Sequence, residues 1–217
     1  MTEVPTPHGV AQVDLDRPRR PRSLLVLGHG AGGDVDAPDL LAVRAAALAA
    51  SVAVARITQP YRVAGRRAPA PAGQLDVAWL AALATLTRPV RATAAELVEA
   101  APGKRSTALS RLPLIVGGRS SGARVACRTA QEAGAAGIVA LAFPLHPPGR
   151  PERSRAEELL TGLPTLVVNG DRDPFGVPEA GPGIEVCVRP GQRHDLRGDP
   201  AGTGAAVVDW LVRHGWA

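Results

Sequence analysis

Aromatic residues are scarce in this 217-residue chain: they make up 3% of it, while hydrophobic residues as a whole make up 45%. The core must therefore be built mainly from alanine, valine and leucine. Cysteine is also rare, because Cys127 and Cys187 are the only two and form no C-x-x-C pair. Both lie in apolar stretches, which is typical of reduced core cysteines and argues against a disulfide-bonded secreted scaffold.

Long hydrophobic runs are missing as well. No stretch is apolar over the ~18 residues that a membrane-spanning helix needs. Residues 1–10 do not contain a basic segment followed by an apolar block, so we expect neither a signal peptide nor a membrane anchor. These absences favour a cytoplasmic protein with no membrane partner. The length fits one domain over residues 1–217, which we expect to act as a monomer or homodimer.

Lysine is almost absent, since Lys104 is the only lysine among 25 basic residues. The arginines give a formal charge of +5 and form two clusters, RPRRPR at 17–22 and RVAGRR at 62–67. Such clusters can mark a nucleic-acid surface. No zinc-finger spacing, RNA-binding aromatic motif or heptad repeat accompanies them. We therefore interpret them as a solvated arginine-rich surface and expect no nucleic-acid partner.

The apolar residues gather in short runs of strand length, and helical patterns lie between them. Continuously apolar runs, as in a parallel sheet covered on both faces, occur at 23–29, 52–58, 113–118, 137–143, 164–170 and 184–190. Residues 9–16 alternate and predict an edge strand with one wet face. Helical patterns occur at 39–51, 74–86, 90–100, 121–134, 155–160 and 201–215. This order predicts an α/β fold with a mostly parallel sheet of about seven strands and helices on both faces.

Residues 112–130, LPLIVGGRSSGARVACRTA, hold an apolar run that stops at two glycines and continues into a helical pattern. Between the two, residues 118–122 match G-x-S-x-G, the pattern of a nucleophile elbow. At such an elbow the serine takes a strained backbone conformation, and a Cβ at either flanking glycine would clash. The alternative is a glycine-rich turn with a capping serine. We favour the elbow, with Ser120 as the nucleophile.

A serine hydroxyl needs a base to take its proton, and this type of elbow orders its partners as Ser, acid, His along the chain. His8 and His29 precede the serine. His146 is too early to follow an acid after the sixth strand, and His214 lies in the last helical pattern. His194, in the loop after the last predicted strand, is the remaining candidate for the base.

The acid is expected within residues 167–176, VVNGDRDPFG, where two carboxylates follow the end of a strand. Asp173 precedes Pro174, which sets a turn geometry, and we favour it. Asp171 is the alternative, although its simpler role would be to stabilise the turn.

An oxyanion hole needs two backbone N–H donors. We expect one from Ser121, the residue after the nucleophile. The second should come from the loop LGHGAGGD at 27–34, whose small residues let the backbone approach a tetrahedral intermediate; we choose Ala31, with Gly32 as its neighbour. His29 is expected to brace this loop. A phosphate-binding loop is the rival interpretation, but neither the G-K-[ST] ending nor G-x-G-x-x-G occurs.

Two loops follow predicted strand ends and are candidate walls of a substrate pocket, residues 59–73 and 143–154. We predict Arg119, Gly32 and His146 as substrate-binding residues. Arg119 could attract an anionic substrate or pair with a carboxylate, and the sequence favours neither role.

The chain resembles the α/β-hydrolases, in particular the small lidless branch related to dienelactone hydrolases. Within that branch it resembles the subgroup containing a testis-expressed protein and a subunit of a chromatin acetyltransferase complex. The stretches that carry the resemblance are HGAGG (29–33), GGRSSGAR (117–124), FPLHPPGRP (143–151), NGDRDPFG (169–176) and RHD (193–195). The resemblance extends from about Leu24 to the final helix and implies Ser120, Asp173 and His194 as nucleophile, acid and base.

This resemblance implies an α/β-hydrolase fold without a cap domain, since few residues lie between Phe143 and Pro164. It also implies a serine hydrolase that cleaves small ester or thioester substrates through an acyl-enzyme, with no metal or organic cofactor. The alternative is a non-catalytic interaction module that keeps the hydrolase scaffold, because some members of the subgroup serve as interaction subunits.

Overall fold

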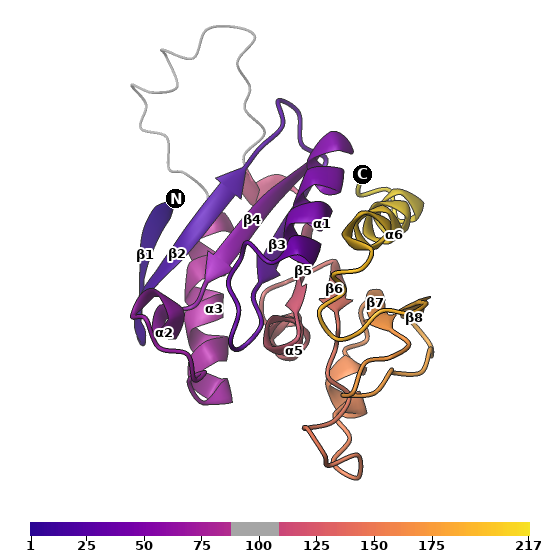
Figure 1. Ribbon diagram of the computed structural model, residues 1–217. Coiled ribbons are helices and arrows are strands. Elements are labelled where there is room, and N and C mark those ends of the chain that lie inside the picture. The colour runs from indigo at the N-terminus through magenta and orange to yellow at the C-terminus, as the bar shows by residue number, and fades with distance from the viewer. Residues whose placement is uncertain (88–108) are drawn as a thin grey trace, which may run out of the picture.

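A computed structural model describes residues 1–87 and 109–217 of the chain, and within them one eight-stranded sheet runs in the order β1-β2-β4-β3-β5-β6-β7-β8 (Figure 1). The strands are β1 (Thr2–Thr6), β2 (Gly9–Asp16), β3 (Ser23–Gly28), β4 (Val52–Thr58), β5 (Leu114–Arg119), β6 (Gly137–Leu141), β7 (Thr165–Gly170) and β8 (Ile184–Arg189). Neighbours from β4 through β8 are parallel, whereas β2 is antiparallel to both β1 and β4.

Helices cover both faces of this sheet. They are α1 (Pro38–Ala49), α2 (Pro60–Val63), α3 (Ala72–Thr87), α5 (Ser121–Thr129) and α6 (Pro200–Arg213), with the 3₁₀ helices η1 (Leu109–Arg111) and η2 (Ala156–Leu159). Side chains of β3 alternate between the two layers, as successive residues of a strand must. Leu25 and Leu27 join the core cluster of α1 and α6, while Leu24 and Val26 join that of α3 and α5. Figure 1 shows these two helix pairs on opposite sides of the sheet.

The predicted parallel strands are all present, but the sheet has one strand more than expected. Residues 2–6 pair with residues 9–13 as β1, so β1 and not β2 lies at this edge of the sheet. The prediction of residues 9–16 as the edge strand was wrong. An alternation of apolar and polar residues indicates that one face of a strand is exposed to solvent, and it does not indicate that the strand lies at the edge of the sheet. The predicted helix at 121–134 ends at Thr129, and the one at 90–100 lies outside the described residues.

The few aromatic residues are concentrated in the core. Trp79 of α3, Trp210 of α6 and Phe143 after β6 are among the largest fully buried side chains. The remainder of the core is mostly alanine, valine, leucine and isoleucine, as the composition predicted. Each helical layer therefore has one buried tryptophan packed against small aliphatic side chains.

The chain between β6 and β7 forms only loops and the short helix η2. An inserted cap domain is therefore not present at this point, in agreement with the expectation from the sequence. Among the residues that the structure describes, no helix has the length and apolar character to cross a membrane.

Candidate active site

The predicted site residues lie where parallel strands end at one edge of the sheet. Ser120 follows β5, Asp173 follows β7 and His194 follows β8. The carboxyl ends of parallel strands meet at the same edge, which is where open α/β sheets build their sites. The topology thus brings together side chains that are far apart in the sequence.

Ser120 occupies a sharp turn between β5 and α5. Its backbone has φ 53° and ψ −110°, a conformation that residues with a side chain rarely adopt and that stores strain. A Cβ at Gly118 would lie 2.6 Å from the carbonyl oxygen of Gly28, and one at Gly122 would lie 2.5 Å from the same oxygen. Any side chain at either glycine would therefore push β3 away from the turn.

The structure brings Ser120, His194 and Asp173 into one hydrogen-bonded row. His194 Nε2 lies 2.9 Å from Ser120 Oγ, and His194 Nδ1 lies 2.8 Å from Asp173 Oδ2. Because an ionised carboxylate can only accept, the proton of the neutral ring is on Nδ1, and Nε2 is free to accept from the serine hydroxyl. The Asp173 side chain is fully buried, whereas His194 remains 19% exposed.

The buried carboxylate of Asp173 has further donors. The backbone N–H of Phe175 donates to Oδ1 at 2.9 Å, and Asn169 Nδ2 lies 3.4 Å from Oδ2. Asn169 is itself fully buried and bonds both the N–H and the carbonyl of Phe143. Asp171, in contrast, is exposed, so the structure places Asp173 and not Asp171 against the histidine.

Three features hold the loop that carries His194 in place. The Phe175 ring packs on the imidazole with 4.3 Å between the ring centroids. Leu196, two residues after His194, is fully buried and has a φ of 49°. Arg119 Nη2 donates to the backbone carbonyl of His194 at 3.0 Å. These contacts limit how far the imidazole can move away from Ser120.

His29 braces the loop after β3. The backbone N–H of Gln59 donates to its Nε2 at 3.0 Å, so Nδ1 carries the proton and donates to the Gly30 carbonyl at 2.8 Å. Burial lowers the pKa of His29 below its usual value, which keeps the ring neutral and maintains this pattern. Gly33 N–H donates to the same carbonyl at 3.2 Å.

These contacts also orient Ala31. The peptide bond between Gly30 and Ala31 is trans, so the Ala31 N–H points away from the Gly30 carbonyl, which accepts from His29. Tyr61 Oη donates to the Ala31 carbonyl at 2.7 Å, which restrains the next peptide as well. Ser121 is the first residue of α5, where an N–H has no acceptor within the helix. The loop that carries Ala31 lies close to Ser120, since a Cβ at Gly30 would lie 3.6 Å from the Ser120 Cβ.

The three predicted substrate-binding residues have different surroundings. Gly32 is exposed, and a Cβ there would meet nothing within 4 Å. His146 packs against the loop that carries the acid: its N–H donates to the Phe175 carbonyl at 3.1 Å, and its Nδ1 lies 3.0 Å from the Pro147 carbonyl. Arg119 pairs with the buried Asp39, with 3.0 Å between Nε and Oδ2.

Four residues at the site were not singled out from the sequence, namely Asn169, Phe175, Tyr61 and Asp39. Asn169 had a signal, because it is the one polar side chain near the end of an otherwise apolar strand. The other three become recognisable only when the loops are folded together.

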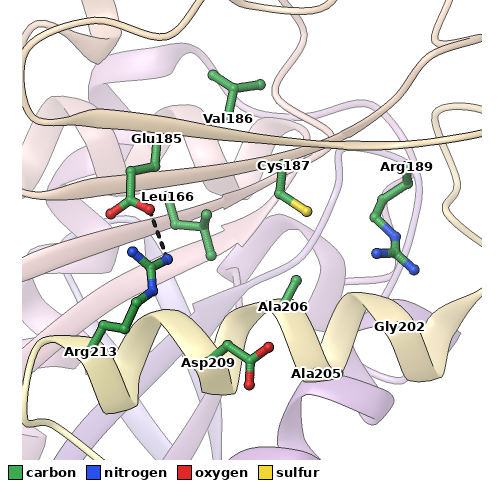
Figure 2. A pocket seen from close by; sticks show the side chains of 10 residues that line it. All are labelled: Leu166, Glu185, Val186, Cys187, Arg189, Gly202, Ala205, Ala206, Asp209 and Arg213. Carbon is green, nitrogen blue, oxygen red and sulfur yellow. Dashed lines mark ion pairs between the residues drawn. The ribbon is translucent and has the colours of Figure 1, made fainter.

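A larger hollow lies away from this row, between β8 and α6 (Figure 2). Its volume is about 430 Å³, and charged residues line it: Glu185, Arg189, Asp209 and Arg213. A small cavity of about 10 Å³ lies beside Ser121 and is lined in part by His29, Tyr61 and Trp79. Because the large hollow contains none of the three residues of the row, we locate the site by hydrogen-bond geometry and not by cavity size.

The strand order, with a serine turn after β5 and no cap between β6 and β7, defines an α/β-hydrolase fold. Residues 21–186 match the model of the family described as an alpha/beta hydrolase domain, and the chain belongs to that family. No curated protein matches the sequence.

Solved structures with this fold align with nearly the whole chain. A dienelactone hydrolase from Anabaena variabilis has a TM-score of 0.72 at 17% identity, covering 98% of this chain and 95% of its own. An α/β serine hydrolase without a lid from Xanthomonas campestris has a TM-score of 0.70 at 16% identity, with 98% and 93% covered. An α/β serine hydrolase homologue from Coxiella burnetii has 0.69 at 17% identity, with 98% and 95% covered. These neighbours share the overall fold that the sequence predicted, and the Xanthomonas protein is the one described as lacking a lid.

Proposed function

We propose that this protein is a serine hydrolase that cleaves small ester or thioester substrates through an acyl-enzyme. The observation that carries the proposal is the continuous row from Asp173 through His194 to Ser120, with contacts of 2.8 and 2.9 Å. A serine hydroxyl is a weak nucleophile unless a base is placed to take its proton, and Nε2 of His194 is so placed.

In the proposed reaction, Ser120 Oγ attacks the substrate carbonyl while its proton passes to His194 Nε2. Asp173 holds the ring orientation and stabilises the imidazolium that forms. The protonated histidine then gives its proton to the leaving alcohol or thiol, leaving the acyl group on Ser120. Water, activated by the same nitrogen, attacks the acyl group and releases the acid.

The N–H groups of Ala31 and Ser121 are the proposed oxyanion donors. Loss of one such donor typically costs about 3 kcal/mol of transition-state stabilisation. The Ala31 peptide is held by His29 and Tyr61, so its N–H direction is set before substrate binds. Pre-set donors are effective because no reorganisation is needed when charge develops on the substrate oxygen.

One observation supports small substrates. The chain has no cap between β6 and β7 that would enclose a long acyl chain. We further propose a cytoplasmic protein, monomeric or homodimeric, that falls in the subgroup with the testis-expressed protein. This assignment depends on the sequence stretches given above.

A fluorophosphonate probe tests the proposal directly, because it reacts covalently with activated serines. We expect the wild type and Ser121→Ala to be labelled, since Ser121→Ala keeps the backbone N–H that the proposal uses. We expect Ser120→Ala to lose both labelling and hydrolysis of short p-nitrophenyl esters. A folded wild-type protein that is neither labelled nor active on esters and thioesters would favour a non-catalytic interaction module.

A further inference from the structure

The Arg119 guanidinium touches three segments of the site. Its Nη2 donates to the carbonyl of His194 at 3.0 Å, and its Nε lies 3.0 Å from Oδ2 of Asp39 at the start of α1. A Cβ at Gly30 would lie 3.1 Å from its Nη1, so the guanidinium also lies against the loop that carries Ala31. Arg119, the residue before Ser120, therefore connects the loop that carries His194, the loop that carries Ala31 and α1.

The Arg119–Asp39 pair is buried, with side-chain exposures of 15% and 0%. Asp39 Oδ1 also accepts from the N–H of Leu40 at 3.0 Å, which fixes the carboxylate within the first turn of α1. Burial raises the pKa of Asp39, although the positive charge of Arg119 opposes this effect. Since the pKa is raised in the folded state, ionising Asp39 lowers stability as the pH rises above its ordinary value of 3.8. Stability therefore does not explain why this position has a charged pair. Replacing a buried ion pair by apolar residues of similar volume often leaves the free energy of unfolding unchanged or raises it.

We propose that Asp39 and Arg119 are positioning residues that hold the main chain of His194, so that its ring stays in line with the Ser120 hydroxyl. The ion pair with Asp39 holds the guanidinium beside the start of α1, and the guanidinium then presents Nη2 to the His194 carbonyl. A lysine could not do both, because its ammonium is a single point on a flexible stem. This inference rests on the proposed hydrolase function and assigns Arg119 a role other than binding an anionic substrate.

The test compares Arg119→Met, Arg119→Lys and the double variant Arg119→Met/Asp39→Leu with wild type. Arg44→Met is the matched control, because Arg44 forms a two-bond ion pair with Asp16 outside the site. Each protein is assayed with a neutral ester, p-nitrophenyl acetate, and an anionic one, mono-p-nitrophenyl succinate. Unfolding temperature is measured for each variant, and the pH dependence of kcat/KM for each active one.

We expect Arg119→Met and Arg119→Lys to lower kcat about 10- to 100-fold with both esters and to leave KM unchanged, because a displaced base loses its attack geometry. The pH dependence of kcat/KM should differ from that of wild type, because the acid and base groups that set it no longer meet in the wild-type geometry. The double variant removes both charges; it should unfold at or above the temperature of Arg119→Met and still be slow. Arg44→Met should match wild type in kcat and pH profile.

Three results would overturn the inference. Wild-type kcat and pH profile in Arg119→Met would show that the His194 carbonyl needs no such donor. A rise in KM for the succinate ester alone would assign Arg119 to substrate binding. Full activity in the double variant would reduce the pair to a structural role. In each of these cases the wild type is active and labelled at Ser120, whereas failure of the proposed function is an unlabelled, inactive wild type.

Discussion

Two regions of this molecule each hold a potential nucleophile, and the one with Ser120 has a histidine nitrogen within hydrogen-bond distance of it. Ser120 lies at the carboxyl edge of the sheet, with a histidine nitrogen 2.9 Å from its hydroxyl, and a cavity of about 10 Å³ lies beside its neighbour Ser121. Cys187 lies in the much larger hollow between β8 and α6, of about 430 Å³ (Figure 2). That hollow is lined by arginines, carboxylates and small residues, with no histidine among them. The larger hollow and the hydrogen-bonded serine thus lie in different regions. The short contact between the serine hydroxyl and the histidine is the reason for choosing the Ser120 region as the candidate active site.

The two regions also differ in how their polar groups are held. Around Ser120 the groups are mostly buried and have several partners each, as Asp173 and His29 show. Around Cys187 the charged residues sit at a more open surface, where Arg213 pairs with Glu185 at 2.8 Å and both are more than 40% exposed. Exposed pairs of this kind contribute little to stability and hold geometry poorly. Preorganised polar groups therefore distinguish the candidate active site from an ordinary surface hollow.

The largest expected effect concerns the acid of the row. Asp173→Asn should lower kcat by roughly 10⁴-fold, because an amide no longer selects the ring tautomer with its proton on Nδ1. Asp171→Asn, at the exposed carboxylate two residues earlier, is the matched control and should retain wild-type activity in an ester assay. Loss of activity in Asp171→Asn with full activity in Asp173→Asn would reverse the assignment.

A smaller effect is expected for Tyr61→Phe, which removes the hydrogen bond to the Ala31 carbonyl. One such bond contributes about 1 kcal/mol, so kcat should fall roughly 5- to 10-fold with KM unchanged. Steady-state kinetics with a short p-nitrophenyl ester provide the measurement. An unchanged kcat would show that His29 alone is sufficient to orient this loop.

The third effect is on stability and depends on pH. The pKa of His29 is lowered in the folded state, so below its ordinary value of 6.5 the unfolded chain takes up a proton that the folded chain refuses. The free energy of unfolding should therefore fall as the pH drops through 6.5, and this part of the slope should vanish in His29→Gln. Urea unfolding at about pH 7.5 and about pH 5.5 measures the slope. His8→Gln, at an exposed histidine, is the control and should keep the wild-type slope.

The smallest effect is expected in the hollow of Figure 2. Cys187→Ala should leave ester hydrolysis unchanged, because no histidine lies among the residues that line the hollow around Cys187. Iodoacetamide should modify Cys187, which is partly exposed, and spare Cys127, whose pKa burial raises to about 12. Mass spectrometry identifies the modified cysteine. Loss of ester hydrolysis after alkylation of Cys187 would indicate that the reaction takes place in the hollow between β8 and α6.

The sequence was most informative where a local pattern has a steric cause. Gly118 and Gly122 predicted a tight elbow, and the structure shows that a Cβ at either position would meet the Gly28 backbone. The continuous apolar runs predicted the parallel strands. The pattern was less informative at residues 2–6, whose pairing with the next strand depends on backbone hydrogen bonds that no side-chain period reports.

By itself, the sequence determined the fold class and the parallel strands of the sheet, because burial on both faces leaves continuous apolar runs in the sequence. It also predicted Ser120, Asp173 and His194 from motif and chain order, and their catalytic roles remain the proposal made above. Only the tertiary structure decided which groups contact that row and the neighbouring loop that carries Ala31. Asp39, Tyr61, Asn169 and Arg119 act through contacts between segments that are distant along the chain, and such contacts exist only after the sheet has brought its carboxyl ends together.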